Sequence, residues 1–212
     1  MGYDRKDAFY RKAKREGERS RAAYKLVELN QKFRLFKHGD RVLDVGAFPG
    51  GWSQVAGRAV GGKGRVVGID LVPIEPVPEK NVLFLQGDAT APDTPARLRE
   101  ALGGDADCVL SDASPKLSGV RDADAARVSV LVDEILTLAF EIMAPGANFV
   151  AKVFSRATPH ELVARCKGRF AKVKLFRPEA TRKESSEIYL IALGYRGKPA
   201  APAPPVSPGK AE

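Results

Sequence analysis

Short apolar runs of strand length alternate along this chain with segments of helical composition or periodicity. The first run leads into Asp44, and six more lie at 65–70, 81–88, 106–112, 148–154, 171–176 and 186–195. Helices are expected at 4–17, 19–37, from Trp52 onward, and at 94–102, 124–143 and 159–169. The alternation predicts an α/β fold, with a seven-stranded, mainly parallel, doubly wound sheet and helices on both faces. Because a loop joins the last two strands, we expect them to pair antiparallel.

The chain divides by composition into three parts. Residues 38–195 carry the alternating pattern and are expected to form one domain. Residues 1–37 form a basic helical extension, which should pack on the domain through apolar side chains at helical spacing. These side chains are Leu26, Leu29, Phe33 and Phe36. Residues 196–212 are rich in proline and alanine without periodicity, so we expect them to be disordered.

A glycine-rich turn follows the first strand, in the stretch RVLDVGAFPGGWSQ at 41–54. Glycine lets a backbone approach a ligand closely and adopt positive φ at little steric cost. A strand that leads through glycines into a helix N-terminus is typical of a nucleotide pocket. The candidate contacts around this turn are Asp44, Gly46, Gly50, Gly51 and Trp52. The full G-x-G-x-x-G spacing is absent, so a turn that serves packing alone is the alternative.

Four aspartates stand at or near the C-terminal ends of predicted strands: Asp44, Asp70, Asp88 and Asp112. In open α/β sheets, ligands bind outside these carboxyl ends. Asp70 ends the second strand about 25 residues after the glycine turn, which suits a hydrogen bond to ribose hydroxyls. Asp88, after the third strand, is placed to meet a base edge. A single acid of this kind is also an ordinary turn or helix cap, but four on one edge favour a ligand.

Two charged residues interrupt strands that should be apolar. Lys152 lies within FVAKVF and Glu187 begins EIYLIAL. Burying an unpaired charge costs several kcal/mol, so each needs a partner, and we expect them to pair with each other and with Asp112. A purely structural ion pair, or exposed strand ends, is the alternative to a functional cluster.

The formal net charge of +9 indicates a polyanionic partner, because surface Lys and Arg release counterions from phosphate backbones. The basic residues gather in two zones that flank the pocket motifs. The first is Arg5, Lys6, Arg11, Lys12, Lys14, Arg15, Arg19, Arg21 and Lys25. The second is Lys167, Arg169, Lys172, Lys174, Arg177, Arg182 and Lys183. Two such zones suggest a binding face for RNA or DNA, with a merely soluble surface as the alternative.

Other features concern the compartment. No apolar run approaches the roughly 20 residues that cross a bilayer, and the N-terminus lacks a signal-peptide core. Cys108 and Cys166 are far apart and are expected to be buried thiols in a reducing compartment. A cytoplasmic protein without a membrane partner or a metal site is therefore expected.

Five ordered motifs resemble the FtsJ methyltransferases, also called RrmJ or RlmE. They are RSRAAYKL at 19–26, DVGAFPGGWSQ at 44–54, SDASP at 111–115, AKVF at 151–154 and SSEIYLIA at 185–192. The resemblance runs from Asp4 to Tyr195. It implies a Rossmann-like fold, with 38–195 as the catalytic domain. It also implies an activity that depends on S-adenosylmethionine, namely methylation of a ribose 2′-hydroxyl of ribosomal RNA.

The resemblance also implies roles for particular residues. The family's Lys–Asp–Lys–Glu catalytic tetrad falls on Lys25, Asp112, Lys152 and Glu187. Its cofactor contacts fall on Gly50, Trp52, Asp70, Asp88 and Asp112, in agreement with the ribose and adenine roles inferred above. Three residues depart from the family pattern, namely Phe48 in the glycine turn, where a small residue is usual, and Ser114 and Lys116 after the catalytic Asp.

As a mechanism, Lys152 is expected to orient or deprotonate the 2′-hydroxyl, with Lys25 supplying a neighbouring positive charge and helping to hold RNA. Burial and a second ammonium favour a neutral lysine, whereas the flanking acids favour a charged one. The sequence therefore leaves open whether Lys152 is a base or an orienting group.

The resemblance implies a uridine of large-subunit ribosomal RNA as target, within an assembled subunit, and a monomeric enzyme. Several alternatives remain. A non-catalytic RNA-binding assembly factor would not need an intact tetrad. Base or amine methylation usually uses an Asn/Asp-Pro-Pro-aromatic motif, which SDASPK is not. Hemolysin-type relatives share the tetrad but carry an extra N-terminal domain, for which this chain leaves no room.

Overall fold

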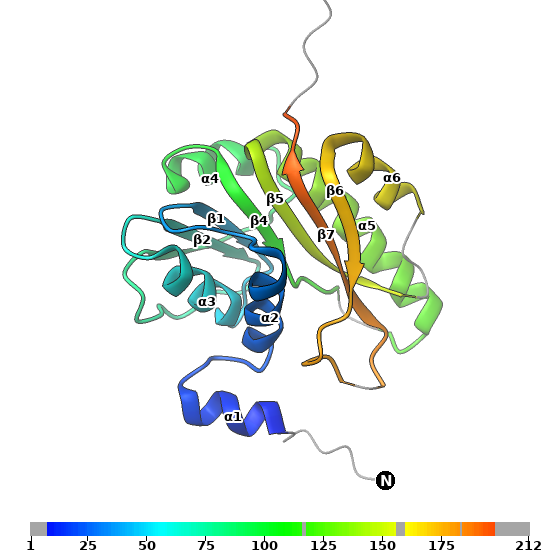
Figure 1. The fold of residues 1–212 in the computed structure, drawn as a ribbon, viewed down its shortest axis with the longest axis horizontal. Coiled ribbons are helices and arrows are strands. Elements are labelled where there is room, and N and C mark those ends of the chain that lie inside the picture. The colour runs from blue at the N-terminus through cyan, green and yellow to red at the C-terminus, as the bar shows by residue number, and fades with distance from the viewer. Residues whose placement is uncertain (1–7, 116–117, 156–159, 183, 198–212) are drawn as a thin grey trace, which may run out of the picture.

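Seven strands form one sheet in the computed structural model, which describes residues 8–115, 118–155, 160–182 and 184–197 (Figure 1). In chain order the strands are β1 Arg41–Val45, β2 Arg65–Asp70, β3 Val82–Gln86, β4 Ala106–Ser111, β5 Met143–Phe154, β6 Phe170–Phe176 and β7 Glu187–Tyr195. Several sequence assignments lie outside the described residues, namely those for Arg5, Lys6, Lys116, Lys183 and 198–212.

The strand order across the sheet is β3-β2-β1-β4-β5-β7-β6. β1 pairs in parallel with β2 and β4, β2 with β3, and β4 with β5. β7 is antiparallel to both of its neighbours, β5 and β6. The predicted mainly parallel sheet is confirmed, and so is the antiparallel pairing of the last two strands. From β1 the chain continues to β2 and β3 on one side, and it then returns to β4 on the other side of β1. The boundary between β1 and β4 is therefore the switch point at which ligands bind in such sheets.

The helices lie on both faces of the sheet, as predicted (Figure 1). They are α1 Ala8–Glu16, α2 Ala23–Phe33, α3 Gly51–Val60, α4 Thr94–Leu102, α5 Arg121–Ile142 and α6 His160–Arg169. α2 and α3 cover one face, and α4, α5 and α6 cover the other. α1 lies beyond α2, away from the sheet (Figure 1). Leu26 and Leu29 of α2 are fully buried and belong to the core that α2 and α3 form with the sheet.

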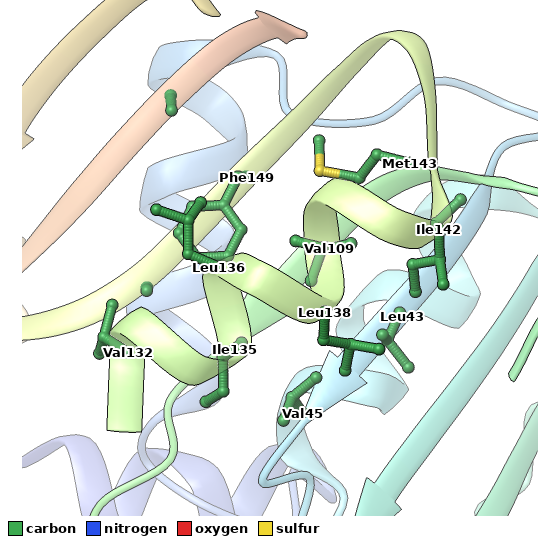
Figure 2. Packing of buried hydrophobic residues seen from close by; sticks show 14 of the residues in the cluster. Leu43, Val45, Val109, Val132, Ile135, Leu136, Leu138, Ile142, Met143 and Phe149 are labelled. Atoms are coloured by element: carbon green, nitrogen blue, oxygen red, sulfur yellow. The ribbon is translucent and has the colours of Figure 1, made fainter. Parts of the chain in front are cut away.

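Alternating strand residues divide the interior into two cores, because successive side chains of a strand point to opposite faces. The α5-side core joins α4, α5 and α6 to the sheet, and Figure 2 shows α5 side chains such as Ile135 and Leu138 facing Leu43 and Val45 of β1. The α2-side core contains the intervening residues, among them Val42 of β1. The α2 side therefore receives every second residue of β4, β5 and β7.

Among the wrong boundaries are the end of the second helix and the start of the fifth strand, and local hydrogen bonds explain the first of these. The second helix was expected to reach residue 37, but α2 ends at Phe33 and Arg34 is left-handed, with φ of 55°. The side chain of Asn30 accepts hydrogen bonds from the amides of Leu35 at 3.0 Å and Phe36 at 3.4 Å. This side-chain cap replaces the helical bonds of the last turn, so that Leu35 and Phe36 are buried in the α2-side core.

The second wrong boundary lies between α5 and β5. The sequence predicted a helix over 124–143, a turn, and a strand from 148, whereas α5 spans Arg121–Ile142 and β5 begins at Met143. The residues expected to form the turn belong to the strand, because Met143 already pairs with Ala106 of β4. An irregularity in register between Ala106 and Cys108 accommodates the extra residues.

Gly46 is the point where the turn after β1 passes closest to the end of β4. Its φ is +74°, and a Cβ built there would lie 2.5 Å from Cβ of Ala113 and 2.7 Å from its Cα. Both the backbone conformation and the close approach therefore require glycine.

We expect Gly46→Ala to lower the free energy of unfolding by about 1–3 kcal/mol, from positive φ and steric overlap together. Urea unfolding of the purified protein measures this change. Gly62→Ala is the matched control, because no atom lies within 4 Å of a Cβ built there. An unfolding free energy for Gly46→Ala equal to that of the control would contradict the steric argument.

Candidate active site

A cavity of about 840 Å³ opens at the C-terminal ends of β1, β2 and β4, beside α5. This volume lies within the usual range for sites that bind small ligands. Its walls come from the turn after β1, the ends of β2 and β3, the end of β4 and one side of α5. Among its lining residues are Gly46, Phe48, Asp70, Leu71, Asp88, Thr90, Asp112, Ala113, Ser114, Arg127, Val130 and Glu134.

The cavity brings together four of the sequence-predicted cofactor residues. Gly46, Asp70, Asp88 and Asp112 all line it. The other four, Asp44, Gly50, Gly51 and Trp52, are not among its lining residues. They lie behind the wall or at the start of α3, where each has a structural contact described below.

Two of the lining carboxylates are fixed by backbone amides. Asp70 accepts hydrogen bonds from the amides of Phe48 and Val72, each at 3.0 Å. Asp88 accepts from the amide of Thr90 at 2.8 Å and from its hydroxyl at 2.7 Å. The hydrogen bonds from Thr90 lower the pKa of Asp88. Both carboxylates are thus fixed in place, with lone pairs left to accept hydrogen bonds from a ligand's hydroxyl or amino groups.

Asp44 lies behind the cavity wall, only 1% exposed, at the end of β1. Its Oδ2 accepts a hydrogen bond from the hydroxyl of Ser53 at 2.6 Å. Its Oδ1 is buried without a hydrogen-bond partner among the described residues. Burial raises the pKa of Asp44 to about 7, against the opposing effect of the Ser53 hydrogen bond, and the charge of Asp112 raises it further. The unsatisfied oxygen fits a donor such as an ammonium group or an ordered water.

Gly50 and Gly51 allow the segment before α2 to pack on the start of α3. Gly50 has φ of +104°, and a Cβ on Gly51 would lie 2.5 Å from the hydroxyl oxygen of Ser20. The guanidinium of Arg19 donates to the carbonyls of Pro49 at 3.1 Å and Glu75 at 2.5 Å. Arg19 therefore braces the glycine turn and the loop after β2.

Trp52 links α3 to α2 and β7 within the α2-side core. Its indole N–H donates to the carbonyl of Ala22 at 2.8 Å, and its ring lies 5.6 Å from that of Tyr189. Trp52 is 3% exposed, so it is a core side chain in this structure.

The four residues of the expected tetrad meet at the same edge of the sheet as two ion pairs. Nζ of Lys25 lies 2.8 Å from Oε2 of Glu187. Nζ of Lys152 donates to the carbonyl oxygen of Asp112 at 2.6 Å and lies 3.4 Å from its Oδ1. The expected direct pair between Lys152 and Glu187 is absent from the described residues, and this prediction is corrected. Lys152 pairs with Asp112 and Lys25 with Glu187 instead.

Strand alternation explains why these side chains share one face. Cys108 and Leu110 of β4 belong to the α2-side core, so Asp112 continues that face at the strand end. Lys152 lies directly opposite Tyr189 in the β5–β7 pair, two residues from Val150 on the same face. α2 covers this face and adds Lys25, so that Lys25 is 8% and Lys152 6% exposed.

The charges of the pairs act on Glu187. Burial raises the pKa of Glu187, but the ammonium of Lys25, its hydrogen bond, and the charge of Lys152 lower it, with a net shift below the usual value. Glu187 is therefore an ionised partner in the buried cluster.

Tyr189 is a residue that the sequence reasoning missed. Its hydroxyl donates to Oδ1 of Asp112 at 2.7 Å, the same oxygen that faces Lys152. Burial raises the pKa of Tyr189 well above its usual value, and the charge of Asp112 adds to this effect. The available signal was spacing, because a residue two positions after Glu187 on a strand points to the same face.

A second cavity, of about 410 Å³, lies on the other side of the tetrad. It is lined mainly by residues with charged or polar side chains, namely Arg21, Ala22, Lys25, Arg182, Glu184, Ser185 and Glu187. Lys25 and Glu187 therefore have access to this second space, while Asp112 lines the first.

The second basic zone does not form one surface beside the cavities. β6 begins beside the end of β7 and ends beside Tyr189, at the tetrad. Lys167 and Arg169 precede β6 and lie at the opposite edge of the sheet, whereas Arg177 and Arg182 follow it at the tetrad edge. The expectation that the whole set flanks the pocket is corrected to these last two residues.

Within the described residues, no helix is long and apolar enough to cross a membrane. The same part of the chain holds no group of three or more His, Cys, Asp or Glu side chains able to bind a metal ion. Cys108 and Cys166 are both buried free thiols, as expected.

Residues 18–195 match the model of the FtsJ-like methyltransferases. The chain belongs to this family. Ribosomal RNA large subunit methyltransferase E of Rhodopseudomonas palustris (strain TIE-1) is 48% identical over 194 residues, which cover 90% of this chain and 81% of that protein.

Two solved structures resemble the fold of this FtsJ-like methyltransferase. A putative ribosomal RNA methyltransferase from Plasmodium falciparum has a TM-score of 0.75 and 30% identity, over 85% of this chain and 100% of that one. A putative methyltransferase from Streptococcus mutans, solved in complex with SAH, has a TM-score of 0.51 and 11% identity, over 79% of this chain and 96% of that one.

The buried carboxyl of Asp44 gives this methyltransferase a defined pH dependence. An unfolded aspartate has a pKa of about 3.9, whereas burial raises that of Asp44 to about 7. Between these values the folded protein retains a proton that the unfolded chain has lost, so stability falls as pH rises from about 4 to about 7.

We expect Asp44→Asn to abolish this part of the pH dependence. The stability of the variant relative to the wild type should increase by a few kcal/mol between about pH 4 and pH 7, because three pKa units correspond to about 4 kcal/mol. Urea unfolding at several pH values measures the difference. A difference that stays constant with pH would refute the assignment.

Proposed function

We propose that this FtsJ-like methyltransferase transfers the methyl group of S-adenosylmethionine to the ribose 2′-hydroxyl of a uridine in 23S ribosomal RNA of the large subunit. The observation that carries the proposal is the pair of buried ion pairs, Lys25–Glu187 and Lys152–Asp112, between two cavities. The name of the R. palustris relative supports ribosomal RNA as the substrate class.

The larger cavity fits S-adenosylmethionine by its volume and its polar groups. Asp70 would bind the ribose hydroxyls and Asp88 the adenine edge, since both are acceptors fixed by backbone amides. Gly46 lines the cavity and has no side chain that would fill it. Asp44, two residues earlier in the chain, has the unsatisfied Oδ1. The start of α3, at Gly50, Gly51 and Trp52, would favour the cofactor's carboxylate through the positive end of the helix dipole. The SAH bound in the S. mutans protein supports the choice of cofactor.

When bound, the cofactor supplies an activated methyl group, so the main task left to the protein is alignment of the acceptor oxygen. Lys152 would hold the 2′-hydroxyl and orient or accept its proton. Its ammonium is fixed by the carbonyl and carboxylate of Asp112. Tyr189 in turn fixes that carboxylate, so that the position of Lys152 depends on both residues.

Lys25 and the second cavity would receive the RNA. Lys25 is held by Glu187 and faces a polar space that also contains Arg21 and Arg182. A target nucleotide in this space would approach the tetrad from the side opposite the cofactor. The proposed substrate is the assembled large subunit, and the proposed enzyme is a monomer that acts in the cytoplasm.

Lys152→Ala is expected to reduce methyl transfer by at least about 100-fold, because the group that orients or accepts the proton is removed. Radiolabelled S-adenosylmethionine and undermethylated large subunits measure transfer, with the label mapped to a ribose or a base. Binding of S-adenosylhomocysteine, followed by calorimetry, should change little and reports that the variant is folded. Lys63→Ala, an exposed lysine at the opposite edge, is the control.

Full activity of Lys152→Ala would remove Lys152 from the mechanism. Label on a base would refute ribose methylation. No label from the wild type, despite bound cofactor, would favour the RNA-binding assembly factor or another RNA.

The exposed basic side chains of α1 are placed to contact RNA phosphates outside the second cavity. Arg11, Lys12, Lys14 and Arg15 are all exposed, and Lys12 lies over the ring of Tyr24 on α2 at 4.6 Å. α1 is therefore held near the tetrad edge of the domain (Figure 1).

Replacing these four α1 residues with Ala is expected to weaken RNA binding and to flatten its dependence on salt, because fewer counterions are released. Filter binding over a range of salt concentrations measures both quantities. The control variant replaces the exposed residues Lys37, Lys63, Arg65 and Lys167 with Ala, so that the same amount of positive charge is removed at the opposite edge of the sheet. Equal losses in the two variants would show a general charge effect and contradict a specific role for α1.

A further inference from the structure

Phe48 is an aromatic side chain exposed at the mouth of the larger cavity. It is 56% exposed, and it is the single aromatic residue among the described residues that line this cavity. Isolated exposed apolar side chains are common and need no explanation. Phe48 differs because it is part of a group.

Two more exposed apolar residues line the same cavity. Leu71, just after β2, is 69% exposed, and Val130 on α5 is 60% exposed. The three residues come from three separate segments of the chain, yet they converge on one opening. Exposed apolar side chains that gather at the mouth of a cavity are typical of a surface that a ligand covers.

The backbone of Phe48 is firmly held beside Asp70. Its amide donates to Oδ2 of Asp70 at 3.0 Å, and the amides of Gly46 and Ala47 donate to the carbonyl of Ile69 at 2.9 Å and 3.2 Å. On the other side, Arg19 binds the carbonyl of Pro49 at 3.1 Å. The turn therefore presents the ring from a fixed position, which lowers the entropic cost of a contact.

Phe48 and Leu71 flank the carboxylate that the proposed function assigns to the ribose. Leu71 follows Asp70 directly in the chain, and Phe48 is hydrogen-bonded to it through its amide. A nucleoside has the complementary chemistry, because its sugar edge carries hydroxyl donors and its base has flat apolar faces. The polar and apolar groups thus match one ligand.

We infer that Phe48 is a cofactor-binding residue whose ring forms the outer wall of the nucleoside part of the cavity. Binding of the adenosine half of the cofactor covers the ring and removes it from water. This inference rests on the proposed function, because it takes the larger cavity as the cofactor site. It adds a contact at a position where the resemblance leads one to expect a small residue.

The test is the affinity of Phe48→Ala for two ligands that share the adenosine group. Calorimetry gives the dissociation constants of S-adenosylhomocysteine and of 5′-methylthioadenosine, which lacks the amino-acid part. Both should rise by a similar factor, about tenfold, because burial of an aromatic ring contributes to both complexes. Phe48→Tyr should keep affinity within about twofold, because the ring is retained.

Leu83→Ala is the matched control, since Leu83 on β3 is 41% exposed and does not line the cavity. It should bind both ligands as the wild type does. Thermal unfolding without ligand should be unchanged for Phe48→Ala, because an exposed side chain contributes little to the core.

Three results would overturn the inference while leaving the proposed function intact. They are unchanged affinity of Phe48→Ala for both ligands, a loss for S-adenosylhomocysteine alone, and a raised KM for the ribosomal subunit without a change in cofactor affinity. The last result would place an RNA base on the ring. Failure of the wild type to bind S-adenosylhomocysteine would instead overturn the proposed function and the inference together.

Discussion

The burial of two lysines at the C-terminal edge of the sheet is the constraint on which the arrangement of this protein depends. An ammonium removed from water costs several kcal/mol unless a partner and further hydrogen bonds replace its hydration. Lys25 is paired with Glu187, and Lys152 with Asp112. Because each lysine faces one carboxylate, the local charge is balanced. Loss of one member would leave its partner buried and uncompensated.

The N-terminal extension completes this cluster and also supports the glycine-rich turn. α2 brings Lys25 to the sheet, while the carbonyl of Ala22, just before it, accepts the indole N–H of Trp52. Arg19 holds the carbonyl of Pro49 in the turn itself. The extension expected to bind RNA therefore also supports the glycine-rich turn, whose residues Gly46 and Phe48 line the larger cavity. Docking of the extension and the geometry of the larger cavity are consequently coupled.

Tyr189 connects the cluster to the core below it. Its ring packs near Trp52, and its hydroxyl binds the carboxylate of Asp112. Asp112 lines the larger cavity, whereas Lys25 and Glu187 line the smaller one. A single hydrogen-bonded carboxylate thus lies between the proposed cofactor and the lysine proposed to face the RNA ribose.

The alternation of apolar runs and helical segments determined the seven-stranded sheet, its two layers of helices and the edge at which Asp70, Asp88 and Asp112 gather. These features follow from periodicity and from the direction of parallel strands, which are local or topological properties. Local signals failed where a single side chain changes the chain's path, as when Asn30 ends α2 at Phe33. Only the tertiary structure decided which lysine pairs with which acid, that Trp52 lies in the core, and that Lys167 and Arg169 lie far from the site. It also showed that Tyr189 binds Asp112 and that Phe48 faces the larger cavity. Such contacts join residues that are distant in the sequence, and their geometry depends on how α2 packs on the sheet.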